Sequence, residues 1–410
     1  MRRSVGLTVV LLVGALGVAP AVAAPTSSQP AATSAERVTL LTDPFLQKPE
    51  PRAVSVVWFT ELKQSAQHVV VVGEAAPVVS RDEVVAAVKA GKSHLRHGRL
   101  SARLVHAGTT PMTRLREDFE SQWGSAKVEQ GRDMRRAVQR HEARIDRLQP
   151  GKRVAYRVVS LTSDGAAMSA AATLSTAPPK GKGAKILLTS DHQAMNNTPA
   201  AMEVAEQTAG GPFDAVFYAG DLANQPDRAS EWFDGNRGVS FFPVLQGRTL
   251  HASTHGEQYR GGAIIQHAPL FTTIGNHEVQ GRYDGVKGIG ESFNNPRPRA
   301  VAEAMYEKVA AQANPGNDPE VKARWIEDHS FSTRTYEELF SLPASASGRE
   351  TYYATTLGDV RLISLFATRN WTNGTAEPDP TKRDKNSRFT AASRSPPPQW
   401  PTRASEATGR

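Results

Sequence analysis

Three short clusters of polar residues in the middle of the chain carry the side chains best suited to chemistry. They read Ser190-Asp191-His192-Gln193, Gly220-Asp221-Leu222-Ala223-Asn224 and Gly275-Asn276-His277-Glu278. Carboxylates, amides and imidazoles can bind a metal ion, transfer a proton or contact an anionic substrate. One Gly-Asp or Gly-Asn pair is an ordinary turn. The recurrence of three such clusters therefore indicates a functional site.

Each cluster directly follows a short apolar segment that we expect to be a β-strand. A helix-forming stretch at 198–207, which Gly210-Gly211 ends, separates the first two segments, and strand-helix-strand spacing predicts a parallel α/β sheet with strands buried on both faces. Ligands usually bind at the carboxyl ends of such strands. We therefore expect Asp191, Asp221 and Asn276 to converge at one edge. The expected strands are 186–189, 213–219 and 270–274.

The predicted grouping of two carboxylates and an amide implies a cation. Like charges at close range raise each other's pKa by several units unless a positive charge neutralises them. A divalent or trivalent metal ion resolves this conflict. The sequence thus predicts a metal site at the sheet edge.

The three clusters resemble those of the calcineurin-like metallophosphoesterases. That family shows Asp-x-His, Gly-Asp-x-x and Gly-Asn-His-Glu (or Asp) in this order, each after a strand. The upstream β-rich region resembles the fibronectin-III-like N-terminal domain of purple-acid-phosphatase-like members, through Asp43-Pro44-Phe45-Leu46-Gln47, Val56-Val57-Trp58 and Leu148-Gln149-Pro150-Gly151. The resemblance implies an N-terminal all-β sandwich followed by an α/β metallophosphoesterase domain with α/β/β/α layers, incomplete at its C-terminus.

The resemblance also implies roles for individual residues. Asp191 would bind one metal ion, Asp221 would bridge two, Asn276 would bind the second, and His277 would be the catalytic residue that contacts the phosphoryl oxygen or the leaving group. The cofactors would be two divalent or trivalent ions, such as Fe, Mn or Zn. The implied reaction is hydrolysis of a small phosphate monoester by two-metal activation of water, with a phosphodiester as the alternative substrate. Glu278 is expected to orient its neighbours rather than to bind metal.

Several positions depart from the family pattern. Gln193 stands where the family has a histidine ligand, and we expect its amide oxygen to bind, with the neighbouring His192 as the alternative. Asn224 stands where purple members have a tyrosine, so a ferric ion is not required. The later Gly-His-x-His pair is missing, and His329 is expected to be a surface residue. An alternative function is therefore a catalytically impaired member that acts at most as a binding or metal-binding protein.

Composition narrows the remaining classes of function. The 410 residues allow two domains, and the absence of cysteine excludes disulfides and thiolate metal sites. The formal net charge of +8 comes from arginines dispersed among acidic residues, which is typical of a solvated surface. We therefore expect no nucleic-acid partner.

The ends of the chain differ in composition from its middle. Residues 1–23 combine Met1-Arg2-Arg3, a short apolar run and Ala21-Val22-Ala23, which predicts a signal peptide and a secreted or extracytoplasmic protein without a stable membrane span. A retained membrane anchor is the alternative. The tail is Pro- and Arg-rich with few aliphatic residues, and is expected to be disordered. We hypothesise that truncation or a frameshift replaced the end of the catalytic domain. The expected segments are a linker at 24–37, a sandwich with a charged insertion at 38–179, a partial metallophosphoesterase domain at 184–372 and the tail at 373–410.

Overall fold

The structure is a computed structural model that describes residues 38–62, 64–124, 127–293 and 297–367, with two short strands beyond them. These strands are β20 (Thr375–Ala376) and β21 (Ser387–Arg388), which pair in parallel. The predicted signal peptide and linker lie outside the described residues, as does the predicted tail apart from β20 and β21. One compact unit of the chain begins at Val38.

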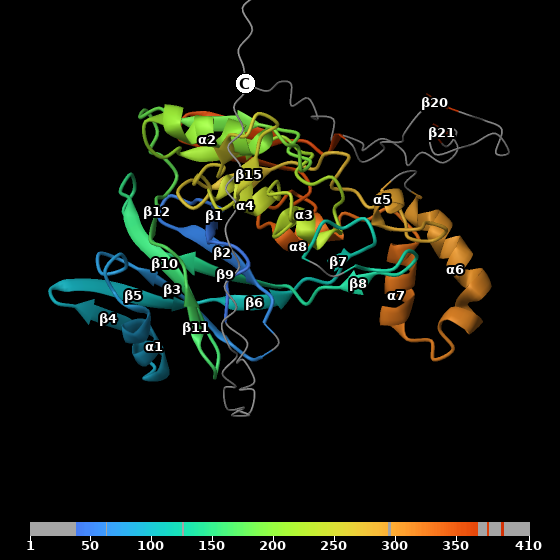
Figure 1. Cartoon of the computed structure of the whole chain (residues 1–410), viewed down its shortest axis with the longest axis horizontal. Helices are drawn as coiled ribbons and strands as arrows, with labels where there is room; N and C mark the ends of the chain where they lie inside the picture. The colour runs from blue at the N-terminus through green and yellow to red at the C-terminus, as the bar shows by residue number, and fades with distance from the viewer. Residues whose placement is uncertain are drawn as a thin grey trace, which may run out of the picture. The chain divides into compact units, whose positions relative to one another are not determined.

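Two antiparallel sheets form the N-terminal half of this unit (Figure 1). The first has the strand order β1-β2-β9-β6 and the second β11-β10-β3-β5-β4, with β12 paired to β10. Helix α1 (Arg81–Lys89) begins with a capping box formed by Ser80 and Glu83. The strands of the first sheet are β1 (Phe45–Gln47), β2 (Val54–Thr60), β6 (Gly108–Pro111) and β9 (Gln139–Ile145). Those of the second are β3 (Gln67–Val72), β4 (His94–His97), β5 (Leu100–His106), β10 (Val154–Leu161), β11 (Ala166–Met168) and β12 (Ala172–Leu174).

Strand β2 contributes to two cores at once. Val54, Val56 and Trp58 lie on one face and pack against the second sheet, as their alternation in the sequence predicts. Val57 and Phe59 lie on the other face and pack against aromatic residues of the C-terminal half. All seven residues of the strand are buried. The sandwich and the α/β region therefore share a continuous hydrophobic core.

A buried polar network lies inside the sandwich. The imidazole rings of His68 and His141 stack with centroids 3.5 Å apart. Nε2 and Nδ1 of His141 lie 2.8 and 2.9 Å from the hydroxyls of Thr60 and Thr109, and Nδ1 of His68 lies 2.9 Å from Ser160 Oγ. Each ring thus has a hydrogen-bond partner that suits a neutral imidazole.

The charged insertion predicted in the sandwich, which the charge-rich run at 89–146 indicates, is shorter than expected. Strands β4, β5, β6 and β9 all fall within it and belong to the sandwich, because apolar residues such as Leu95 and Leu104 alternate with the charged ones and face the core. The true excursion is the loop 112–138, which contains the short pair β7 (Arg116–Glu117) and β8 (Met134–Arg135).

Arg136 in this loop joins the sandwich to the α/β region. Its guanidinium is 2% exposed and donates to Glu61, Glu117 and Asp234, with Nη1 2.7 Å from Asp234 Oδ1 and 3.1 Å from Glu117 Oε1. The indole of Trp123 lies 4.5 Å from the guanidinium carbon. One buried cation therefore holds three carboxylates from three segments of the chain.

The C-terminal half contains a parallel sheet with the order β13-β14-β17. Helix α2 connects the first two strands and ends at Gly210, whose φ is 62°. The predicted strand-helix-strand unit is confirmed to within two residues at each boundary. The bounds are β13 (Ile186–Thr189), α2 (Thr198–Ala209), β14 (Ala215–Tyr218) and β17 (Leu270–Thr272).

Short helices and hairpins surround this sheet. The antiparallel hairpin β18–β19 contacts β17 through Tyr353 Oη, which donates to Thr272 O at 2.7 Å. Helices α6 and α7 pack on each other through a small separate core (Figure 1). The bounds are α3 (Ala229–Trp232), α4 (Phe241–Leu245), β15 (His251–Ala252), β16 (Gln258–Tyr259), α5 (Ile289–Ser292), α6 (Arg299–Ala313), α7 (Pro319–Asp328), α8 (Arg334–Leu339), β18 (Tyr353–Leu357) and β19 (Val360–Ser364).

Strand β13 differs from the expectation that all parallel strands are buried on both faces. Strands β14 and β17 are buried throughout, whereas Leu188 in β13 is 70% exposed. Both β13 and β17 are edge strands of the described sheet, so the exposure of Leu188 reflects a face of β13 that is left uncovered rather than its place at an edge. Hydrophobic composition indicated a strand but could not reveal which of its faces would be covered.

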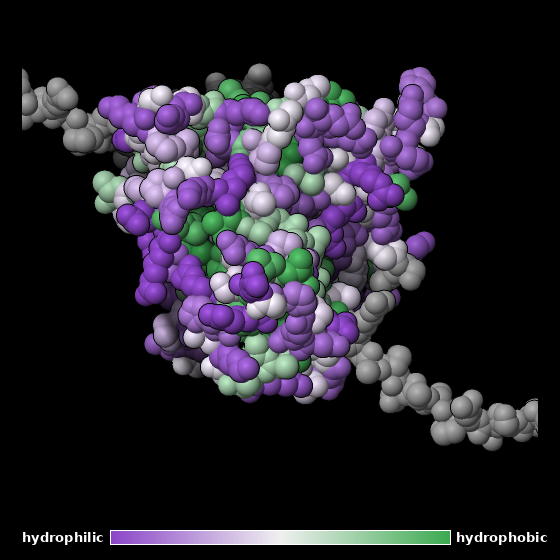
Figure 2. Space-filling model, turned by 90° about the vertical axis from the view of Figure 1, so that its left-hand side faces the viewer, coloured by the Kyte–Doolittle hydropathy of each residue, from purple (hydrophilic) through white to green (hydrophobic). Residues whose placement is uncertain are grey.

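The described surface is mainly hydrophilic. The face shown in Figure 2 has charged and polar residues between small groups of apolar ones. Large apolar side chains that are more than half exposed include Leu188, Leu250 and Ile363. None of the helices in the described part of the chain is long and apolar enough to span a membrane.

Candidate functional site

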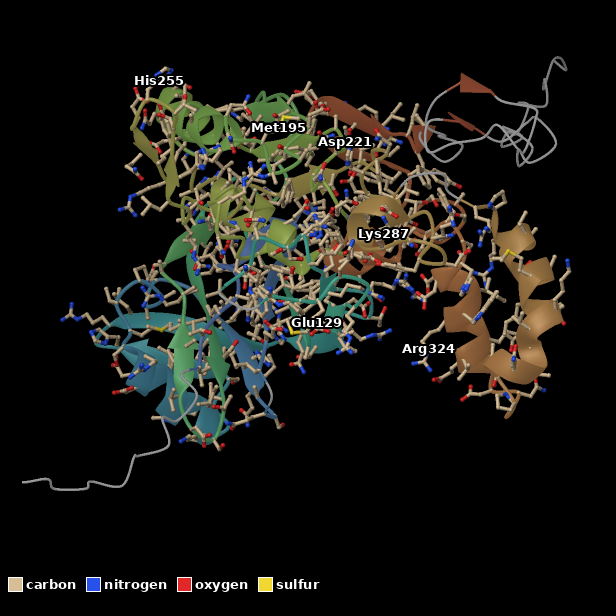
Figure 3. All side chains as sticks on the ribbon, turned by 45° about the vertical axis from the view of Figure 1, so that its right-hand side comes forward. Glu129, Met195, Asp221, His255, Lys287 and Arg324 are labelled. Atoms are coloured by element: carbon tan, nitrogen blue, oxygen red, sulfur yellow. The ribbon has the colours of Figure 1, made fainter. Side chains whose placement is uncertain are left out.

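The three polar clusters meet at the carboxyl edge of the parallel sheet. Asp191 N donates to Gly220 O at 3.1 Å, and Gln193 N donates to Asp221 O at 3.2 Å. The third cluster joins through His277, whose backbone N donates to Asp221 Oδ1 at 3.1 Å. Met195, just beyond the first cluster, and Asp221 lie in the same upper region of the view in Figure 3. The predicted convergence at Asp221 is thus present in the described structure.

The backbone at this edge is held in an uncommon conformation. Asp191, Gln193, Ala194 and Asp221 all have φ between 41° and 57°, the left-handed region that non-glycine residues rarely adopt. A Cβ on Gly275 would lie 2.1 Å from Asp221 Oδ1, so only glycine fits there. Such strain is concentrated at functional sites, where surrounding contacts maintain it.

The carboxylate of Glu278 stabilises the backbone of the second and third clusters. Its carboxylate accepts the backbone N–H groups of Asp221, Leu222 and Gly275 at 2.9, 2.7 and 2.7 Å. The side chain is buried, and burial raises its pKa to about 7 against the opposing effect of these hydrogen bonds. The expected orienting role of Glu278 agrees with this geometry.

Replacing Glu278 with glutamine tests the orienting role. The amide nitrogen would face at least one backbone donor, leaving that N–H unsatisfied, so we expect the free energy of unfolding to fall by about 1–3 kcal/mol. Urea unfolding measures the change. The matched Glu303→Gln variant removes an exposed pair with Arg299 and should change stability by less than about 0.5 kcal/mol. Equal, small effects of the two substitutions would contradict the role.

His277 is held with one ring nitrogen available. Its Nδ1 donates to the carbonyl oxygen of Asn224 at 2.8 Å, and its ring stacks on Phe293 with centroids 4.4 Å apart. The proton on Nδ1 leaves Nε2 as the atom that can meet a substrate. Sequence reasoning singled out His277 but missed the part played by Asn224, because a backbone carbonyl has no residue-type signal.

His192 is not the replacement ligand. Its ring is fully buried, Nε2 donates to Val239 O at 2.8 Å, and burial lowers its pKa to about 4. The ring packs edge-on against Phe241. The alternative that His192 turns toward a metal ion is therefore wrong. Gln193 instead faces the site, where its Nε2 lies 3.1 Å from Asp221 Oδ2.

The remaining predicted residues have different surroundings. Asp191 is exposed and Asn276 is half-buried at the same edge. His329 contacts α7 instead of the polar clusters. Its Nδ1 donates to Trp325 O at 2.7 Å, and its ring stacks on the Trp325 indole with centroids 3.6 Å apart. It closes the end of α7 and is half-buried rather than a plain surface residue.

The donor set at the edge suits one hard cation better than two metal ions. Asp191, Gln193, Asp221 and Asn276 offer carboxylate and amide oxygens, which are the ligands preferred by Mn²⁺, Mg²⁺ or Ca²⁺. Among the described residues, no group of three or more His, Asp and Glu side chains is placed to hold a metal ion. Within that part of the chain, the second set of ligands needed for the predicted pair of Fe, Mn or Zn ions is not found.

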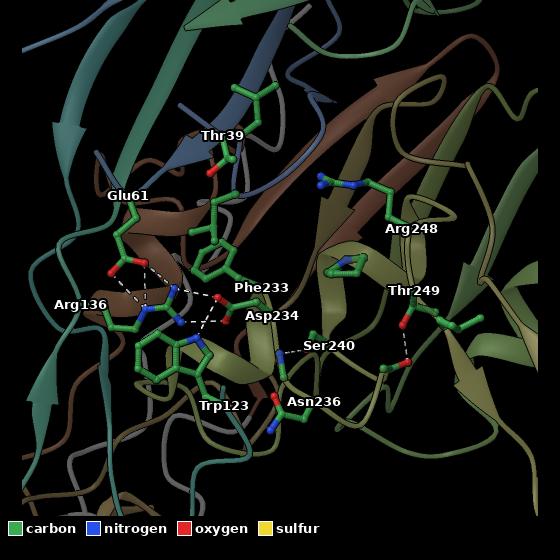
Figure 4. Close-up of a pocket in the computed structure, with 16 residues that line it drawn as sticks. Thr39, Glu61, Trp123, Arg136, Phe233, Asp234, Asn236, Ser240, Arg248 and Thr249 are labelled. Atoms are coloured by element: carbon green, nitrogen blue, oxygen red, sulfur yellow. Dashed lines mark hydrogen bonds and ion pairs between the residues drawn. The ribbon is translucent and has the colours of Figure 1, made fainter. Parts of the chain in front are cut away.

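A separate cavity of about 550 Å³ lies at the junction of the sandwich and the α/β region (Figure 4). Its polar side chains are largely paired with one another: Arg136 with Glu61 and Asp234, and Trp123 Nε1 with Asp234 at 3.0 Å. Hydrogen bonds that are already made within the protein offer little to a ligand. Arg136, Trp123 and their carboxylate partners in this cavity thus already satisfy one another.

Comparison with known proteins leaves the family open. No protein-family model and no curated protein matches the chain. Similar solved structures include a purple acid phosphatase from yellow lupin (Lupinus luteus) seeds, with 16% identity, a TM-score of 0.44 and coverage of 78% of this chain and 43% of that one. Another is astrotactin-2, with 13% identity, a TM-score of 0.18 and coverage of 41% of this chain and 28% of that one. A third is a family 123 glycoside hydrolase from Clostridium perfringens, with 8% identity, a TM-score of 0.13 and coverage of 50% of this chain and 36% of that one. The chain thus spans less than half of the phosphatase chain. Likenesses as distant as these do not indicate a function.

Proposed function

We propose that the chain is a cation-dependent phosphoesterase that hydrolyses small phosphate monoesters. The observation that supports this function is the convergence of Asp191, Asp221 and His277 at one sheet edge, with the Asp221 carboxylate at its centre. Carboxylate residues on adjoining turns beside an oriented imidazole suit a reaction at an anionic centre that needs both charge neutralisation, through a bound cation, and proton transfer.

The residues of the edge divide these tasks. Asp191, Asp221, Asn276 and the Gln193 amide oxygen would hold the cation, after rotation of the Gln193 amide, whose nitrogen now faces Asp221. A divalent cation bound there would supply Lewis acidity and would neutralise phosphate oxygens. The strained backbone at 191–194 holds the first of these donors in place before a ligand arrives.

His277 would act on the leaving group. Because Nδ1–H is donated to the Asn224 carbonyl, a second proton on Nε2 would be directed at the bridging ester oxygen. Phe293 covers one ring face and limits rotation of the imidazole. We therefore infer that Nε2 would donate the proton to the leaving group, which is the catalytic role expected for this residue.

Hydrolysis of 4-nitrophenyl phosphate in the presence of Mn²⁺ tests the proposal. We expect turnover by the full chain and a loss of kcat/KM of about 100-fold or more in Asp221→Asn and in His277→Ala, because each removes charge stabilisation or proton transfer. Asp164→Asn, at an exposed turn of the sandwich, serves as the matched control and should retain activity. A folded protein that neither binds Mn²⁺ nor turns over would contradict the proposal.

A second candidate is a cation-binding protein without turnover. The exposed position of Asp191 and the absence, among the described residues, of a second set of metal ligands favour this alternative, because one cation alone does not supply the two-metal activation of water. Calorimetry with Mn²⁺ separates the two. Binding that is lost in Asp221→Asn, without hydrolysis of monoester or of bis(4-nitrophenyl) phosphate, would support the second candidate.

A further inference from the structure

Arg237 lies in the loop between α3 and α4, beside the first polar cluster. Its side chain is exposed, and Nη2 donates to Asn196 Oδ1 at 2.7 Å. Asn196 follows Gln193 by three residues, in the turn where Met195 N bonds His192 O at 2.8 Å. The guanidinium is therefore tethered to the same turn that presents Asp191 and Gln193.

The backbone on both sides of Arg237 is fixed. Its carbonyl oxygen accepts a hydrogen bond from His251 Nδ1 at 2.8 Å, and Val239 O accepts one from His192 Nε2. Gly238 has a φ of 66°, and a Cβ there would lie 2.4 Å from Leu250 O, so the tight turn after Arg237 requires glycine. These contacts hold the arginine at the rim of the candidate site before any ligand binds.

The guanidinium keeps its full charge and most of its donors. An amide oxygen is its hydrogen-bond partner, and no carboxylate of the described residues forms an ion pair with it. Arginine presents five N–H donors in a planar fork that matches a carboxylate or phosphate. An arginine that no carboxylate of the described residues neutralises, tethered to the turn of the proposed phosphate site, is suited to binding a second anionic group.

We propose that Arg237 binds a second anionic group of the substrate and so selects phosphate monoesters that carry an additional carboxylate or phosphate. This inference rests on the proposed function. The cation ligands would take the scissile phosphate, and Arg237 would take the second group at the rim. Arg237 is thus a specificity-determining residue, separate from the residues that hold the cation.

Two matched substrates test the inference. Phenyl phosphate and 4-carboxyphenyl phosphate differ by one carboxylate, and we expect the full chain with Mn²⁺ to prefer the second by about 5- to 20-fold in kcat/KM, the range of a charge-assisted hydrogen bond at a partly exposed position. Arg237→Gln should bring the ratio close to one, and Arg237→Lys should restore part of it. Because the readout is a ratio, general damage to the fold does not move it.

Control variants and binding measurements complete the test. Arg260→Gln removes an exposed arginine elsewhere in the α/β region and should leave the ratio unchanged, whereas Asn196→Ala, which releases the tether, should reduce it. An equal ratio in the full chain and in Arg237→Gln would overturn the inference. If neither ester is hydrolysed, the proposed reaction fails, and calorimetry with benzylphosphonate and 4-carboxybenzylphosphonate decides the inference: an affinity preference that Arg237→Gln removes supports it, and equal affinities overturn it.

Discussion

Replacing Arg136 with methionine is expected to lower the free energy of unfolding by about 3–5 kcal/mol, because removing one partner of a buried ion network leaves the others uncompensated. Glu117 is fully buried and would lose its cationic partner, and the carboxylates of Glu61 and Asp234 would remain close to it. Because methionine fills much of the volume of the arginine side chain, the loss of stability reports the removal of the charge and not the creation of a cavity. The midpoint and slope of urea unfolding give the value.

The control for Arg136 is a similar residue in the same loop. Arg132 forms an exposed pair with Glu129, with both side chains at least 75% exposed. Arg132→Met should therefore change stability by less than about 1 kcal/mol. A loss for Arg136→Met no larger than this would show that the network does not hold the two halves together.

The stacked pair His68 and His141 is expected to make the protein less stable as the pH falls below about 6.5. Burial lowers the pKa of His68 to about 4 and that of His141 to about 3, so the unfolded chain takes up protons in this range while the folded chain does not. Stability is fully present above the unfolded pKa and decreases by up to about 1.4 kcal/mol per pH unit for each ring below it. Between pH 6.5 and 5 the two rings together should lower the free energy of unfolding by about 2–4 kcal/mol.

A substitution isolates this contribution from that of other groups. Glu278, with its raised pKa, acts in the opposite direction, but it is present in every variant and cancels in the comparison. His141→Gln keeps a donor and an acceptor for Thr60 and Thr109, and should reduce the pH slope of the unfolding free energy by about 1 kcal/mol per pH unit. His97→Gln, at an exposed position beside Glu83, should leave the slope unchanged. A slope in His141→Gln equal to that of the full chain would refute the prediction.

Local features of the fold were predictable because they depend on neighbouring residues. The apolar runs at 186–189, 213–219 and 270–274 marked the parallel strands, and the glycine that begins each of the last two clusters marked the turns. The order of the clusters also predicted their meeting at one edge. The roles of Asp191, Gln193, Asp221 and Asn276 as cation ligands stay predictions, and the experiments above test them.

Other features depend on residues that are far apart in the chain. Arg136 meets Asp234 across 98 positions, and nothing near either residue signals the contact. The inward turn of His192 depends on the carbonyl of Val239, and the tether of Arg237 depends on Asn196. A sequence pattern names the residue types at a turn, but the direction of each side chain is decided by the segments packed around it.

The dual burial of β2 has a consequence for biosynthesis. Phe45 and Phe59 pack against Phe242, with ring centroids 5.0 and 5.4 Å away, and Phe59 also meets Phe233 at 5.1 Å. N-terminal segments emerge first during synthesis and generally begin to fold first. The newly made sandwich therefore presents an uncovered aromatic face to the cell until the segment around Phe242 has left the ribosome. The fraction of newly made chains that reach the native fold would therefore depend on chaperones or on the rate of translation during that interval.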